Sequence, residues 1–235
     1  MELQPERGVL EMNVKSIFSI PRGLVILMAG LASQQMAFGH HAEFMEGHPL
    51  VQGLSMPLHG LDHILMAIAV GIIAVQLGGR ALWMAPVGFS AVLLTGGLLN
   101  LRGISLPLLE LMIVTSLLLA GAQLGLENRL PAGIIVVLFS LLGAFHGQAL
   151  ILPLLAEAPL ADILLFIGGC VFSALLLLSL GVGIGFLLKK NVREKNLFPL
   201  AGACLAVSAL VIVLVPEANG WLGTVFEGLG TAIFS

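Results

Sequence analysis

Seven long apolar segments constrain the fold of this chain more than any other feature of its sequence. They run near residues 17–37, 54–77, 81–99, 104–125, 131–154, 160–188 and 197–215. A helix needs about 20 predominantly apolar residues to cross a bilayer. The strands of a membrane barrel would instead alternate apolar and polar residues over about ten positions. The segments therefore predict an all-α integral membrane protein.

The composition excludes several classes of soluble protein. Among the 235 residues, 58% are hydrophobic and only 10% are charged, whereas soluble domains carry roughly 25% charged residues. So few charges cannot cover the surface of a soluble enzyme, of a nucleic-acid-binding protein or of a disordered chain. The sequence also lacks a GxxxxGK[ST] phosphate-binding motif, so we expect no bound nucleotide and no ATP-driven step.

Positive charges in short loops set the orientation of membrane helices, because they stay on the cytoplasmic side. With a cytoplasmic N-terminus, six of the Lys and Arg residues that follow the first apolar segment lie inside, and only Arg102 lies outside. The inner residues are Arg80, Arg129, Lys189, Lys190, Arg193 and Lys195. We therefore predict a multi-pass protein of a bacterial cytoplasmic (inner) membrane, with residues 40–53 and the C-terminus outside.

The chain divides into four regions under this orientation. In residues 1–39, Lys15 and Arg22 precede an apolar stretch, and Ala37-Phe38-Gly39 has small residues where a signal peptidase cleaves. This region is either a signal peptide or an uncleaved seventh helix. Residues 40–53 form an outer His/Glu-rich loop, 54–215 a six-helix transmembrane bundle, and 216–235 an outer interfacial tail.

Glycine pairs spaced four residues apart occur in three of the segments. They are Gly121/Gly125, Gly143/Gly147 and Gly181/Gly185. Small residues at this spacing let membrane helices approach closely, so we expect these positions at helix crossings. An oligomer is also compatible with the sequence.

Five polar side chains inside the apolar segments are the candidate site. They are His59, Asp62, His63, Glu110 and His146. A charged residue at the centre of a membrane helix costs about 2.5–3.5 kcal/mol, so such residues are functional candidates. In a continuous helix over 54–77, His59 and His63 share one face with Asp62 beside them. The rise of a helix places all five side chains in one layer of the outer half.

Three imidazoles with one or two carboxylates suit Ni²⁺, Co²⁺, Zn²⁺ or Cu²⁺. Asp62 is either a ligand or a residue that orients an imidazole. Glu110 is either a ligand or a proton carrier. His146 taken alone also fits a structural hydrogen bond, and Met56 is either a soft ligand or a packing residue.

The predicted outer loop adds further candidate ligands. They are His40, His41, Glu43, Glu46 and His48. We interpret them either as a weak capture site for the ion at the mouth of the bundle or as a solvated loop.

The stretch Gly53-Leu-Ser-Met-Pro-Leu-His-Gly-Leu-Asp-His-Ile-Leu-Met-Ala-Ile-Ala-Val-Gly71 resembles the HupE/UreJ family. The segments Gly79-Arg-Ala-Leu-Trp83, Leu106-Pro-Leu-Leu-Glu110 and Phe145-His-Gly147 also look like landmarks of that family, and the likeness covers about residues 40–215. The resemblance implies a nickel permease, or in some members a cobalt permease, that serves the maturation of hydrogenase or urease. By position, Asp62, His63, Glu110 and His146 match the family pattern.

The sequence departs from the family pattern at three positions. Met56 stands where the family usually has a histidine, although His59 lies one turn further on. Leu150 and Leu152 replace the second histidine and the glutamate of the motif that begins at His146. The site thus keeps fewer ligands, and a thioether in place of an imidazole suits a softer ion such as copper.

We therefore expect a secondary permease, and not an enzyme, that imports a divalent transition-metal ion across the membrane. The expected ion is Ni²⁺, with Co²⁺ or copper as alternatives, and hydrogenase or urease maturation systems are the implied partners. A non-transporting membrane accessory protein that binds metal is a second hypothesis. A membrane metalloenzyme is a third, although the sequence lacks an HExxH motif.

Overall fold

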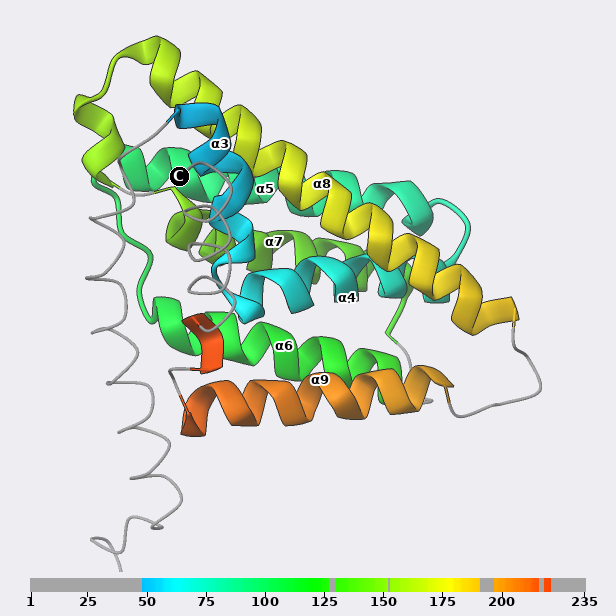
Figure 1. The fold of residues 1–235 in the computed structure, drawn as a ribbon. Coiled ribbons are helices and arrows are strands. Elements are labelled where there is room, and N and C mark those ends of the chain that lie inside the picture. The colour runs from blue at the N-terminus through cyan, green and yellow to red at the C-terminus, as the bar shows by residue number, and fades with distance from the viewer. Residues whose placement is uncertain (1–47, 127–129, 152, 191–196, 216–217, 221–235) are drawn as a thin grey trace, which may run out of the picture.

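The computed structural model describes residues 48–126, 130–151, 153–190, 197–215 and 218–220. Within these ranges every regular element is helical, which confirms the all-α class (Figure 1). The elements are α3 (Pro49–Ser55), η2 (Met56–Leu58), α4 (Leu61–Leu77), α5 (Ala81–Leu101), α6 (Leu109–Gly125), α7 (Ala132–Leu150), η3 (Pro153–Glu157), α8 (Leu160–Lys190) and α9 (Leu197–Leu214). The predicted region 1–39 and most of the predicted tail 216–235 lie outside the described residues.

Among the described residues, four helices are long and apolar enough to cross a membrane, namely α5, α7, α8 and α9. A fifth span forms if the bent pair of Pro49–Leu58 and Leu61–Leu77 is counted as one. Helix α6 is apolar but has only 17 residues, which makes it about 26 Å long. Several apolar helices thus support a membrane protein, while the sixth span stays a prediction.

The second predicted segment, 54–77, is not one continuous helix, so that prediction was wrong. Its two parts, Pro49–Leu58 and Leu61–Leu77, meet at an angle of 77°. Pro57 has no N–H for a helical hydrogen bond, and Gly60 has extended backbone angles (φ −113°, ψ 121°). Helix α4 therefore starts afresh at Leu61. Because of this break, His59 and His63 do not share the face of one helix.

Part of the predicted outer loop 40–53 is also helical. Helix α3 begins at Pro49 and packs against α8, where Gly53 and Gly169 let the two backbones touch. A Cβ atom at Gly53 would overlap the carbonyl of Phe166. Residues 49–53 are therefore part of the helical bundle, whereas residues 40–47 lie outside the described residues.

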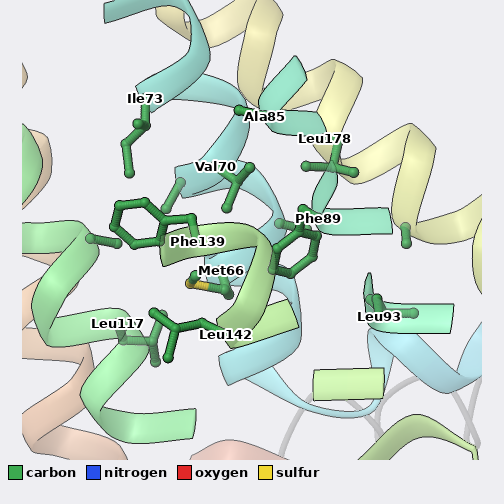
Figure 2. Packing of buried hydrophobic residues seen from close by; sticks show 14 of the residues in the cluster. Met66, Val70, Ile73, Ala85, Phe89, Leu93, Leu117, Phe139, Leu142 and Leu178 are labelled. Carbon is green, nitrogen blue, oxygen red and sulfur yellow. The ribbon is translucent and has the colours of Figure 1, made fainter. Parts of the chain in front are cut away.

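Helix α4 lies at the centre of the bundle and contacts α5, α6, α7, α8 and α9 (Figure 1). Its buried side chains Met66, Val70 and Ile73 meet Phe89 of α5 and Phe139 of α7 (Figure 2). The outward side chains of the other helices are apolar as well, for example Leu176 of α8 and Val207 of α9. A bundle that is apolar both inside and outside is suited to lipid and not to water.

Glycine allows these helices to approach closely, as the three pairs predicted. A Cβ at Gly181 would overlap the carbonyl of Ile68 on α4, and one at Gly147 would overlap that of Leu93 on α5. Gly121 faces Gly202 of α9 in the same way. The close-packing interpretation is thus confirmed at each pair, while Gly125 has more room, with its nearest atom 4.0 Å from a built Cβ.

The packing role of Gly181 can be tested against Gly183, two residues further along α8, where a Cβ would meet no atom within 4 Å. Alanine favours a helix over glycine by roughly 0.5–1 kcal/mol at either position. We expect Gly183→Ala to keep or raise the thermal unfolding temperature in detergent. Gly181→Ala should lower it, because overpacking costs about 1–3 kcal/mol. Equal unfolding temperatures for the two variants would contradict the α4–α8 contact.

Candidate metal site

Two histidines from distant parts of the chain meet inside the bundle. His63 is the third residue of α4, and His146 lies near the end of α7. Their Nδ1 atoms are 2.9 Å apart, and the rings meet edge to face, with centroids 5.2 Å apart and planes at 74°. His146 is 1% exposed. The structure therefore joins two of the five predicted ligands in direct contact.

Ser116 of α6 extends this contact into a chain of three side chains. Its hydroxyl has a single hydrogen, which it donates to the carbonyl oxygen of Ile113 at 2.6 Å. Ser116 Oγ therefore accepts the hydrogen bond that joins it to His146 Nε2 at 2.9 Å. For a neutral imidazole, this leaves the lone pair of His146 on Nδ1, directed at His63. His63 Nδ1 is then the donor within the histidine pair.

Asp62 lies beside His63 in the first turn of α4. Its Oδ1 accepts a hydrogen bond from the backbone N–H of His63 at 2.8 Å, and the same oxygen is 3.9 Å from His63 Nδ1. A carboxylate at a helix N-terminus is stabilised by the helix dipole. The backbone N–H of Asp62 donates in turn to Oδ1 of Asn219 at 3.0 Å. Asp62 therefore places negative charge next to the histidine pair.

A small cavity adjoins the two imidazoles. It is lined by His63, His146, Phe89 and Leu150, together with Pro57, Ala67, Leu93, Ala174 and Leu177. The cavity has a volume of about 10 Å³. A cavity of roughly 10–15 Å³ holds one water molecule. The cavity is therefore about the size of a single water molecule or a single ion. Apart from the two histidines, its walls are apolar.

The other predicted ligands lie outside this pair. His59 follows η2, is buried, and its Nδ1 is hydrogen-bonded to the carbonyl of Ser55 at 2.7 Å. Met56 is buried in the hydrophobic core. Glu110 is half-buried in the first turn of α6, where its carboxyl interacts electrostatically with Asp62. Within the described ranges, no three His, Cys, Asp or Glu side chains are grouped closely enough to hold a metal ion.

His48, from the predicted outer capture site, has a structural role at the start of α3. Its Nδ1 accepts a hydrogen bond from the backbone N–H of Leu50 at 3.3 Å, and its side chain is exposed. The remaining residues of that predicted site lie outside the described residues, namely His40, His41, Glu43 and Glu46. The capture site therefore stays a prediction.

Sequence reasoning missed the amides that hold the connection between α5 and α6. Gln148 Oε1 accepts from the backbone N–H of Leu106 at 2.7 Å, and its Nε2 donates to the carbonyl of Ile104 at 2.8 Å. Asn100 Nδ2 donates to the carbonyl of Gln148 at 2.8 Å. Gln148 lies two residues after His146, so one motif contacts both the histidine pair and the loop that leads to Glu110. The signal that could have found Gln148 and Ser116 is that they are uncharged polar residues within the apolar segments.

The role of Ser116 can be tested with Ser116→Ala, which leaves the buried Nε2 hydrogen of His146 without an acceptor. An unsatisfied buried donor costs about 1–3 kcal/mol, so the unfolding temperature in detergent should fall. The ¹⁵N NMR shifts of the histidine side chains should also show loss of a single Nε2–H form for His146. Ser179→Ala is the matched control, because Ser179 is exposed and bonds only to Leu175 of its own helix. An unchanged His146 spectrum in Ser116→Ala would rule out this hydrogen-bond chain.

Comparison with known proteins agrees with the motifs around these residues. The family described as "HupE / UreJ protein" matches residues 26–212. Protein HupE of Rhizobium leguminosarum bv. viciae is 32% identical over 189 residues, which make up 80% of this chain and 95% of that relative. No solved structure matches the chain. The chain therefore belongs to the HupE/UreJ family.

Proposed function

We propose that this protein is a secondary permease, and not an enzyme, that imports a divalent transition-metal ion, with Ni²⁺ as the expected substrate. The observation that carries the proposal is the contact between His63 and His146 inside an apolar bundle. Imidazoles are good ligands for nickel, copper and zinc ions. The HupE/UreJ family is linked to nickel handling for hydrogenase and urease, which favours nickel and suggests those maturation systems as partners.

The 2.9 Å between the two Nδ1 atoms is a hydrogen-bond distance, so an ion can bind both rings only after they turn until both lone pairs face it. Imidazole nitrogens bind nickel, copper and zinc ions alike. The choice of nickel therefore rests on the family's link to nickel handling and not on this distance.

The hydrogen bonds around the pair suggest how an ion would enter it. With the hydroxyl hydrogen of Ser116 donated to Ile113, a neutral His146 has its lone pair on Nδ1. An ion bound between the two Nδ1 atoms requires the hydrogen of His63 to move from Nδ1 to Nε2. Asp62, 3.9 Å from His63 Nδ1, offsets part of the ion's charge. The cavity beside the rings has room for one water molecule or one ion, so the bundle must widen there before water molecules complete the coordination. Glu110 and His59 act on the route towards the pair.

The membrane potential is the proposed energy source, since the sequence has no ATP-binding motif. Two charges that cross about 100 mV gain roughly 4.6 kcal/mol, which corresponds to an accumulation of about a thousandfold. The proposed orientation has α4 and α6 running inward from the outer face of a bacterial inner membrane. Lys189 Nζ lies 3.9 Å from a Cβ built on Gly78, so the Lys-rich end of α8 and the end of α4 lie on the same side.

The first test is uptake of Ni²⁺ into proteoliposomes under an inside-negative potential. We expect His63→Ala and His146→Ala to lower the initial rate at least about tenfold, because loss of one good ligand is worth 1.4 kcal/mol or more. Thr95→Val is the control, since Thr95 is exposed and bonds only to Ala91 of its own helix. Uptake by His63→Ala at the wild-type rate would contradict the proposed site.

The same assay separates the alternatives. Wild-type protein that binds Ni²⁺ tightly but moves none across the membrane would support a non-transporting accessory protein and contradict a permease. Competition by Co²⁺, Cu²⁺ and Zn²⁺ identifies the preferred ion.

Leu150 offers a gain-of-function test, because it replaces a family histidine and lines the cavity beside His63 and His146. We expect Leu150→His to add a third imidazole and to raise the Ni²⁺ affinity about tenfold, or ~1.4 kcal/mol. Isothermal titration in detergent measures this affinity. Leu141→His, on the exposed face of the same helix, is the control. Equal affinities for Leu150→His and the wild type would argue against a metal in this cavity.

A further inference from the structure

Two glutamine side chains join α4 and α6 at the end of the bundle away from the histidine pair. Gln123 Nε2 donates to Gln76 Oε1 at 3.2 Å, and Gln76 Nε2 donates to the carbonyl oxygen of Leu124 at 3.2 Å. Gln76 is the penultimate residue of α4, and Gln123 lies two residues before the end of α6. Both side chains are half-buried. Their mutual hydrogen bonds hold the ends of the two helices together.

These amides stand out against the rest of their helices. From Ile64 to Leu77 in α4, and from Leu117 to Gly125 in α6, every other side chain is apolar or absent. An interhelical hydrogen bond within a membrane is worth only about 0.6 kcal/mol on average. Two amides therefore add little to the packing of a bundle whose helices already approach closely through glycine. Their shared position, and not their contribution to stability, calls for an explanation.

Helix α6 connects the glutamine pair to the histidine pair. Ser116, Ala120 and Gln123 are spaced four and three residues apart, so they lie on one stripe of the helix. Ser116 bonds to His146, Ala120 is fully buried and small, and Gln123 bonds to Gln76. Along the helix axis, Ser116 and Gln123 are about 10.5 Å apart. A single stripe thus leads from the histidines to the amides.

The chemistry at this end of the bundle suits a hydrated cation. Amide oxygens each have two lone pairs, and Gln76 Oε1 uses one of them to accept from Gln123. The last carbonyl groups of α4 and α6 lack helical partners, and the helix dipole makes these ends partly negative. Side-chain oxygens and helix-end carbonyls can therefore accept hydrogen bonds from the water around a divalent ion.

We infer that Gln76 and Gln123 form the inner station of the ion path, where an ion that leaves the histidine pair regains its water. The hydrogen bond between the two amides joins α4 to α6, and the passing ion replaces it. This inference rests on the proposed permease function. It names a second set of residues, separate from the histidine site, that acts on release and not on capture.

The test measures Ni²⁺ binding and Ni²⁺ uptake separately in the full-length protein. Isothermal titration in detergent reports binding at the histidine pair, and a Ni²⁺-sensitive dye inside proteoliposomes reports uptake. We expect Gln76→Leu and Gln123→Leu to bind Ni²⁺ within twofold of the wild-type affinity but to lose at least about tenfold in uptake rate. Gln123→Glu, which keeps the side-chain oxygens, should retain more than a third of the wild-type uptake.

Thr95→Val is the matched control, because Thr95 is exposed and bonds only to Ala91 of its own helix. Size-exclusion profiles and unfolding temperatures show whether each variant is folded. Uptake within twofold of wild type in both leucine variants would overturn the inference, as would a parallel loss of binding and uptake. Wild-type vesicles that take up no Ni²⁺ would contradict the permease itself, and the inference with it.

Discussion

A lipid bilayer offers no hydrogen-bond partner to a polar side chain, so each such group inside the bundle must find its partner in the protein. This requirement links three helices through one chain of side chains. His63 of α4 meets His146 of α7, and His146 meets Ser116 of α6. The close packing of α4 and α5 against their neighbours, made possible by glycine, brings these groups within hydrogen-bond distance. The site is therefore a consequence of how the central helix is packed.

The break before α4 gives this site its shape. Pro57 and Gly60 end one helix and let another start, so that His63 enters the bundle in the first turn of α4. Asp62 accepts a hydrogen bond from the backbone N–H of His63 in that turn, which keeps its carboxyl group beside the ring. A continuous helix would have placed His59 and His63 together, whereas the broken one pairs His63 with a histidine 83 residues away. The local backbone thus decides which imidazoles meet.

The long apolar helices could be predicted from the sequence because lipid selects long continuous apolar runs, and α5, α8 and α9 begin and end close to the predicted limits. His63 and His146 could be singled out as candidate site residues because imidazoles are rare in such runs. The break at Pro57 and Gly60 was visible in the sequence but was outweighed by the hydropathy of the whole segment. Ser116 and the two glutamines could not be assigned to a site, because apolar periodicity does not say which helices are neighbours.

The most direct test of the account is X-ray absorption spectroscopy of the purified protein loaded with one equivalent of Ni²⁺. We predict two imidazole nitrogens at about 2.1 Å from the nickel, and the scattering from one ring should disappear in His146→Ala and in His63→Ala alike. A nickel spectrum with no imidazole scattering, or one that neither substitution alters, would contradict the assignment of the metal site to this histidine pair.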